Sequence, residues 1–194
     1  MTTSSAAADE VSAIDASPPP MFYVVSLRKL AILYLATFTL YTFYWFYKHW
    51  DMYKGRHPAA SRFGTTIWLV PRAVFPMFFT HSLFFKIRAA GRQLPGAAHW
   101  HAGWYATFAV VWMLLSEVID SLIGGTAGDL VSIGAVFPLL LPLLAAQRMA
   151  NRACGDAQGA SNDALTKANK IWIAIGAVAW LVAIAGLFMP GEGA

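Results

Sequence analysis

The sequence predicts an all-α integral membrane protein with four transmembrane helices and one re-entrant or interfacial helical segment. Of its 194 residues 58% are hydrophobic and only 12% are charged, whereas soluble proteins have about 25% charged residues. The mean hydropathy of +0.52 reflects apolar residues spread along the chain. Several uncharged runs approach the roughly 20 residues that a helix needs to cross about 30 Å of hydrocarbon. These runs are continuous rather than alternating, which favours helices over β-strands.

The first 20 residues differ from the rest of the chain. They are small and polar, contain three acids and end in a proline run. Such a segment cannot bury enough apolar surface to offset its ordering entropy, so we predict a disordered tail over 1–20. It lacks the basic start and apolar centre of a signal peptide. Residues 21–194 are then a single helical membrane domain, whose first hydrophobic run acts as the membrane signal.

Four segments are predicted to span the membrane. The runs at 30–47 and 130–147 contain no charged residue, and neither does the run at 171–189. The run at 104–123 is long enough but carries Glu117 and Asp120. These four helices account for most of the apolar residues of the domain.

The segment 67–85 is ambiguous, because Pro71, Arg72, Pro76 and His81 interrupt it. An arginine at mid-bilayer costs about 2.5–3.5 kcal/mol. If the segment crosses, the preceding loop with four Lys/Arg lies outside, against the positive-inside rule. If it re-enters or lies in the interface, the basic residues stay inside. We therefore expect four spans with both termini outside, and keep five transmembrane helices as the alternative.

Basic residues flank the expected inner ends of the spans. In the four-span arrangement they form an inner-face collar that attracts anionic headgroups at about 1 kcal/mol each: Lys48, Lys54, Arg56, Arg62, Lys86, Arg88 and Arg92. Membrane orientation alone also explains these charges. The last span carries a stripe of small residues suited to close helix packing: Gly176, Ala179, Ala183 and Gly186.

Two acids inside a predicted span are the best candidates for chemistry. Glu117 and Asp120 are three residues apart, on one helix face, where neighbouring carboxylates raise each other's proton affinity. Arg72 and His81 are candidate counter-charges, so these four residues form a candidate intramembrane polar site. The alternatives are that the acids reach water at the outer end of the helix and that Arg72 is an interfacial anchor.

No enzyme motif is present. Phosphate-binding glycine loops, serine elbows and paired zinc motifs are absent, and the single Cys154 has no neighbour that would activate it. We expect no catalytic activity, cofactor, metal or nucleic-acid partner. The sequence favours a non-enzymatic protein that organises membrane lipid, a second copy of itself or another membrane protein. The alternative is an ion- or proton-coupled transport or channel component that uses the intramembrane acids.

One aromatic motif resembles a known family. The string from Leu40 to Lys48, LYTFYWFYK, resembles the first-span signature of small bacterial multi-span membrane proteins classed as a domain of unknown function. The pieces at 71–75 and 147–151, with Asn162, Asn169 and Trp172, are similar to such proteins as well. The resemblance implies a location in the bacterial inner membrane and carries over no active residue. By position, these aromatics indicate an interfacial belt, with a stacking site for an aromatic ligand as the alternative.

Overall fold

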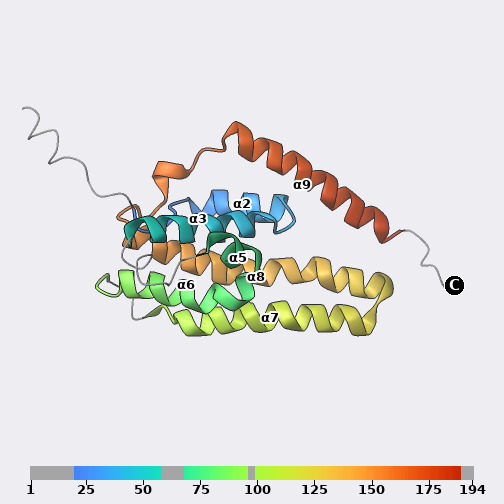
Figure 1. The fold of residues 1–194 in the computed structure, drawn as a ribbon. Coiled ribbons are helices and arrows are strands. Elements are labelled where there is room, and N and C mark those ends of the chain that lie inside the picture. The colour runs from blue at the N-terminus through green and yellow to red at the C-terminus, as the bar shows by residue number, and fades with distance from the viewer. Residues whose placement is uncertain (1–19, 58–67, 96–98, 189–194) are drawn as a thin grey trace, which may run out of the picture.

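A computed structural model describes residues 20–57, 68–95 and 99–188 of the chain. The predicted tail, except Pro20, and Arg62 lie outside the described residues, as does the side chain of Asp120. Within the described ranges the elements are helices and no strand occurs (Figure 1). The prediction of an all-α fold is confirmed.

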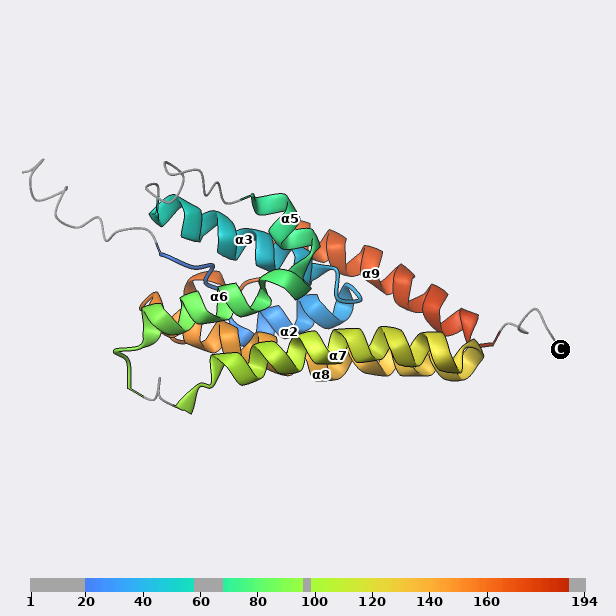
Figure 2. The same cartoon turned by 60° about the horizontal axis from the view of Figure 1, so that its bottom comes forward.

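Three helices are long and apolar enough to span a membrane: α7 (Ala102–Ile123), α8 (Gly125–Ala153) and α9 (Lys167–Gly186). They coincide with three of the four predicted spans, although the count of four plus one re-entrant segment is not confirmed. At 1.5 Å per residue α8 is about 44 Å long, close to the full thickness of a bilayer with its headgroups. Helices α7 and α8 form an antiparallel hairpin, which turns at Gly124 with a φ of 59° (Figure 2).

The apolar run at 30–47 does not form one helix. It is divided between α2 (Leu27–Ala36) and α3 (Tyr41–Arg56), joined by Phe38 and Thr39 in the left-handed region with φ of 50° and 66°. The hydroxyl of Thr37 donates to the Leu33 carbonyl (2.7 Å) and accepts from the Tyr41 amide (3.0 Å). These bonds satisfy backbone groups at the break. The hydropathy of the run predicts a transmembrane helix, but it does not predict the turn that divides the run.

Helix α3 returns to the end from which α2 starts. Phe22, ahead of α2, stacks on Tyr53 near the end of α3, with ring centroids 5.8 Å apart. A single span over 30–47 would place the segment ahead of α2 and the end of α3 on opposite sides of a membrane. The contact between Phe22 and Tyr53 does not agree with that expectation. The two helices form a hairpin whose turn ends well short of the α7–α8 turn (Figure 1).

Helix α9 packs against the turn of this hairpin and stabilises it. The Trp180 indole donates to the Leu35 carbonyl (2.7 Å), and its ring meets Phe38 edge-on at 4.8 Å. Gly176 lies so close to the backbone of Ala36 and Thr37 that a Cβ there would collide with it. Left-handed backbone at a non-glycine residue costs about 1–3 kcal/mol and persists where surrounding contacts impose it. These contacts with α9 supply that constraint.

A second pair of short elements follows in the ambiguous segment. Helices α5 (Leu69–Val74) and α6 (Pro76–Gly91) are separated at Phe75, where proline occupies the first position of α6. Helix α6 packs against the first half of α7, and His81 Nε2 lies 3.1 Å from the Thr107 hydroxyl. The segment 67–85 is thus broken where its second proline predicts an interruption.

The core is concentrated toward one end of the bundle. Helix α2 runs antiparallel to α8, with Val25 bonded to Asn151 and the Tyr34 hydroxyl bonded to the Val136 carbonyl (2.8 Å). The first ten residues of α8 therefore extend past the α2–α3 turn. On the long helices large apolar side chains remain exposed, including Leu122 at 79% and Leu181 at 67%. An exposed apolar surface of this size is typical of a face that contacts lipid or another protein.

Candidate functional site

Positive charge gathers at the end of the bundle where α2 begins and α3, α6 and α8 finish (Figure 1). We call it the basic end. Of the fourteen Lys and Arg residues, Arg62 lies outside the described part of the chain and Arg72 lies on α5. The others lie at or toward the basic end: Arg28, Lys29, Lys48, Lys54, Arg56, Lys86, Arg88, Arg92, Arg148, Arg152, Lys167 and Lys170. The opposite end, around the α7–α8 turn, carries Glu117 and Asp129, and none of the described basic residues lies there.

Some members of the predicted collar have partners within the protein. Lys48 pairs with Asp51 at 3.7 Å. Lys86 donates to the Tyr53 hydroxyl (3.1 Å) and lies 4.5 Å from the centroid of that ring. The side chains of Arg56, Arg88 and Arg92 are exposed. The exposed guanidinium groups are the ones best placed to meet an external anion.

A buried polar network lies inside the basic end, centred on Gln147 of α8. Its Oε1 accepts from the Trp45 indole (2.6 Å) and lies 3.2 Å from His49 Nε2, while its Nε2 donates to the Tyr23 carbonyl (2.9 Å) and to Asn151 (2.6 Å). Burial lowers the pKa of His49 to about 3, so the ring is neutral. This network attaches the segment ahead of α2 to the centre of the bundle.

Asn151, one turn after Gln147, completes this attachment. Its side chain bonds both backbone groups of Val25, accepting from the amide (3.3 Å) and donating to the carbonyl (2.9 Å). The spacing of Gln147 and Asn151 could have indicated that they act together. Polar residues four apart at the end of an apolar run share a helix face.

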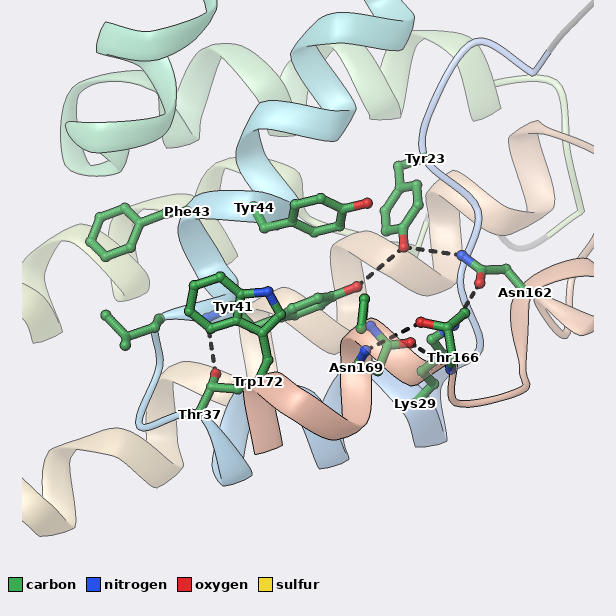
Figure 3. Close-up of a pocket in the computed structure, with 12 residues that line it drawn as sticks. Tyr23, Lys29, Thr37, Tyr41, Phe43, Tyr44, Asn162, Thr166, Asn169 and Trp172 are labelled. Carbon is green, nitrogen blue, oxygen red and sulfur yellow. Dashed lines mark hydrogen bonds between the residues drawn. The ribbon is translucent and has the colours of Figure 1, made fainter. Parts of the chain in front are cut away.

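A pocket of about 560 Å³ lies beside this network, between the α2–α3 hairpin and the start of α9 (Figure 3). One end is polar. There Asn162 donates to the Tyr23 hydroxyl (3.0 Å), which is 3.2 Å from the Tyr41 hydroxyl. Thr166 and Asn169 form a capping box that starts α9 and adds two more polar side chains to the wall. The volume falls within the usual range of small-ligand sites.

Lys29 supplies a buried cation at the polar end of the pocket. Only 2% of the residue is exposed, and its ammonium donates to Asn162 Oδ1 and to the Ala164 carbonyl, both at 2.7 Å. Burial lowers the pKa of Lys29, and the nearby Asp163 opposes this effect. Both described acceptors of the ammonium are neutral.

The carboxylate of Asp163 is engaged by other groups. It accepts from the Ser26 hydroxyl (2.6 Å) and forms an ion pair with Arg28 (2.9 Å). These two donors hold the pKa of Asp163 below its usual range. Arg28, Lys29 and Asp163 together therefore leave one net positive charge beside the pocket.

The other end of the pocket is apolar and aromatic. Phe43 lines it from the hairpin and Trp172 lines it from α9, while Tyr41 and Tyr44 lie between the two ends (Figure 3). Leu40, in the hairpin turn, also lines the pocket. Leu40, Phe43 and Trp172 are 41–53% exposed, so this end is open sideways. The pocket combines a cationic, hydrogen-bonding end with an apolar end.

The predicted intramembrane polar site is dispersed in the structure. The Arg72 guanidinium lies over the rings of Trp50 (4.3 Å) and Phe79 (4.7 Å), and His81 is next to Thr107. Glu117 is exposed on the far half of α7. The ion pairs among the described side chains are Arg28–Asp163 and Lys48–Asp51, so Glu117 is not paired with Arg72. An ion pathway through Glu117 and Asp120 stays a prediction.

The small-residue stripe meets another helix at one of its members. Gly176 is buried against α2, whereas Ala179 and Ala183 are partly exposed and Gly186 has open space around it. The resemblance noted in the sequence includes Asn162 and Asn169, but the sequence did not indicate that they form a pocket with Lys29, because Lys29 and Asn162 are 133 positions apart. In the described part of the chain no three His, Cys, Asp or Glu side chains are grouped to hold a metal ion.

No family model matches the chain, and no curated protein or solved structure is similar to it.

Proposed function

We propose that this chain is a non-enzymatic, multi-pass membrane protein that organises anionic lipid around its basic end. The observation that carries the proposal is the segregation of charge along a bundle of apolar helices. Basic residues lie at or toward one end, and the opposite end carries acids. Clusters of this kind attract anionic headgroups at about 1 kcal/mol per charge.

In the proposed arrangement α7, α8 and α9 cross the bilayer, and the α2–α3 hairpin and the α5–α6 pair enter from the basic end and return. The length of α8, the exposed apolar side chains of the long helices and the break at Phe38–Thr39 support it. Non-helical backbone is tolerated at membrane depth where protein contacts cover it, as α9 covers this turn. The positive-inside rule then orients the basic end toward the cytoplasm. The bacterial inner membrane, implied by the aromatic motif, is part of this proposal.

Removing exposed charges at the basic end should weaken the preference for anionic lipid. The test compares quenching of tryptophan fluorescence by brominated phosphatidylglycerol and by brominated phosphatidylcholine, with the full chain in mixed vesicles. We expect Arg56→Gln, Arg88→Gln and Arg92→Gln together to lower the preference for phosphatidylglycerol, by up to about fivefold per charge. The remaining preference should decline further as salt is raised, because exposed charges are screened.

The substitution Asp129→Asn serves as the control, because it changes a charge at the opposite end of the bundle. It should leave the lipid preference unchanged. Equal quenching by the two brominated lipids in the unaltered protein would refute the proposed function.

A further inference from the structure

The pocket between the α2–α3 hairpin and α9 has a polar end and an apolar end. Its polar groups, Lys29 and Asn162, lie next to the start of α2, and its apolar wall includes Leu40 in the hairpin turn. From Lys29 to Thr37 the α2 axis rises about 12 Å. The pocket therefore changes from polar to apolar along the same axis as the long helices, starting at the basic end (Figure 3).

Among the described residues, the cation in this pocket has no anion of its own. The Lys29 ammonium donates to two neutral oxygens, and the neighbouring carboxylate of Asp163 is already bonded to Ser26 and Arg28. An ammonium has three N–H donors, and two have described acceptors. A buried charge is stabilised by an opposite charge with hydrogen bonds, which a phosphate or carboxylate in the pocket would supply.

A tyrosine hydroxyl of the pocket adds a donor for the same anion. Tyr23 and Tyr41 bring their hydroxyls within 3.2 Å of each other, and either can act as the donor. One O–H is used between them, and the other is free to donate to the anion. Figure 3 shows both hydroxyls on the side of the pocket that holds Asn162 and Lys29. Hydroxyl donors beside an ammonium are suited to the several acceptor oxygens of a headgroup.

We propose that this pocket binds one anionic lipid, with its headgroup at Lys29 and Tyr23 and one acyl chain along Leu40, Phe43 and Trp172. The inference rests on the proposed function, since it assumes that the bundle lies in a bilayer. There the open side of the pocket faces lipid, so a lipid enters laterally with its headgroup at the level of the basic end. A soluble anion would leave the aromatic wall uncovered, whereas an acyl chain covers it.

Native mass spectrometry of the full chain, released from detergent micelles, tests the inference. The probes are phosphatidylglycerol, phosphatidylcholine and soluble glycerol 3-phosphate, each supplied in separate titrations. We expect one phosphatidylglycerol to stay bound to each chain at salt concentrations that remove lipid from the exposed charges. Phosphatidylcholine should be retained at least tenfold less, and glycerol 3-phosphate should not displace the bound lipid.

The substitution Ala168→Trp blocks the pocket. Ala168 is exposed and lines the pocket from α9, so a larger side chain fills the space without removing a described contact. We expect this variant to lose the single bound lipid by tenfold or more. Ala174→Trp is the matched control, because Ala174 is also exposed on α9 but does not line the pocket. The control should retain the lipid as the unaltered chain does.

The substitution Lys29→Met tests the headgroup contact, and its expected result is equal retention of the two phospholipids. Unchanged retention by Ala168→Trp would overturn the pocket assignment, and so would displacement of the lipid by glycerol 3-phosphate. Equal retention of both phospholipids by the unaltered chain would overturn the anionic headgroup. These failures are distinguishable from failure of the proposed function, because the tryptophan-quenching test compares the variant at Arg56, Arg88 and Arg92 with the unaltered chain. Both keep the pocket and its Trp172, so a difference between them reports on the exposed charges alone.

Discussion

The Gln147→Leu variant is expected to be less stable than the unaltered protein by about 3 kcal/mol or more. The substitution removes the partner of the Trp45 indole and of the Tyr23 carbonyl, and also a donor to Asn151. Gln147, Trp45 and Asn151 are fully buried, so the indole and the Asn151 side chain cannot turn to water. Each buried polar group that loses its partner costs about 1–3 kcal/mol. Reversible unfolding of the full chain in mixed micelles would measure the loss.

The matched control for this variant is Gln158→Leu. Gln158 is exposed in the loop after α8, so its replacement leaves no buried group without a partner. Exposed substitutions of this kind usually change stability by no more than about 0.5 kcal/mol. If the two variants unfold with the same free energy, the hydrogen bonds of Gln147 do not stabilise the attachment of the segment ahead of α2.

A methyl group at Gly176 should separate α9 from the hairpin turn. In Gly176→Ala the new Cβ would collide with the Ala36 carbonyl and the Thr37 backbone. Backbone cannot rotate aside as a flexible side chain does, so one helix has to move. We expect a loss of about 1–3 kcal/mol, the usual cost of overpacking, in spite of the better helix propensity of alanine.

Gly186→Ala gives the opposite expectation on the same helix. Among the described residues no atom lies within 4 Å of the position where its Cβ would be, so the gain in helix propensity is not offset. That gain is about 1 kcal/mol in a helix interior and smaller at Gly186, the last residue of α9. Thermal unfolding of the two variants in one detergent should therefore move in opposite directions. An unaffected Gly176→Ala would show that the close approach to α2 does not exist in solution.

The sequence predicts the long helices well, because their signal is local. Helices α7, α8 and α9 each follow from an apolar run of sufficient length. The run at 30–47 carries the same signal and yet contains a turn, because the contacts that impose it come from Trp180, 145 positions after Leu35. Composition within the run holds no trace of such contacts.

One part of the candidate site could also be predicted from the sequence, and another part could not. The basic collar is visible in the sequence because its cations lie near apolar runs. Four of its members lie at helix ends or in exposed positions, as that pattern indicates: Lys54, Arg56, Arg88 and Arg92. The pocket is not visible, because Lys29, Tyr41 and Asn162 come together only when α2, α3 and the loop before α9 have folded. Arg72, which the sequence suggests as a partner for acids, lies on the ring faces of Trp50 and Phe79 instead.

The contacts between α9 and the hairpin turn also have a consequence for the order of assembly in a growing chain. Leu35 leaves the ribosome 145 residues before Trp180, an interval of roughly 7–30 s at 5–20 residues per second. During that interval the uncharged run at 30–47 has no Gly176 or Trp180 to hold its turn. It is long enough to be inserted as one helix, so we expect the hairpin to be completed only when the last helix arrives.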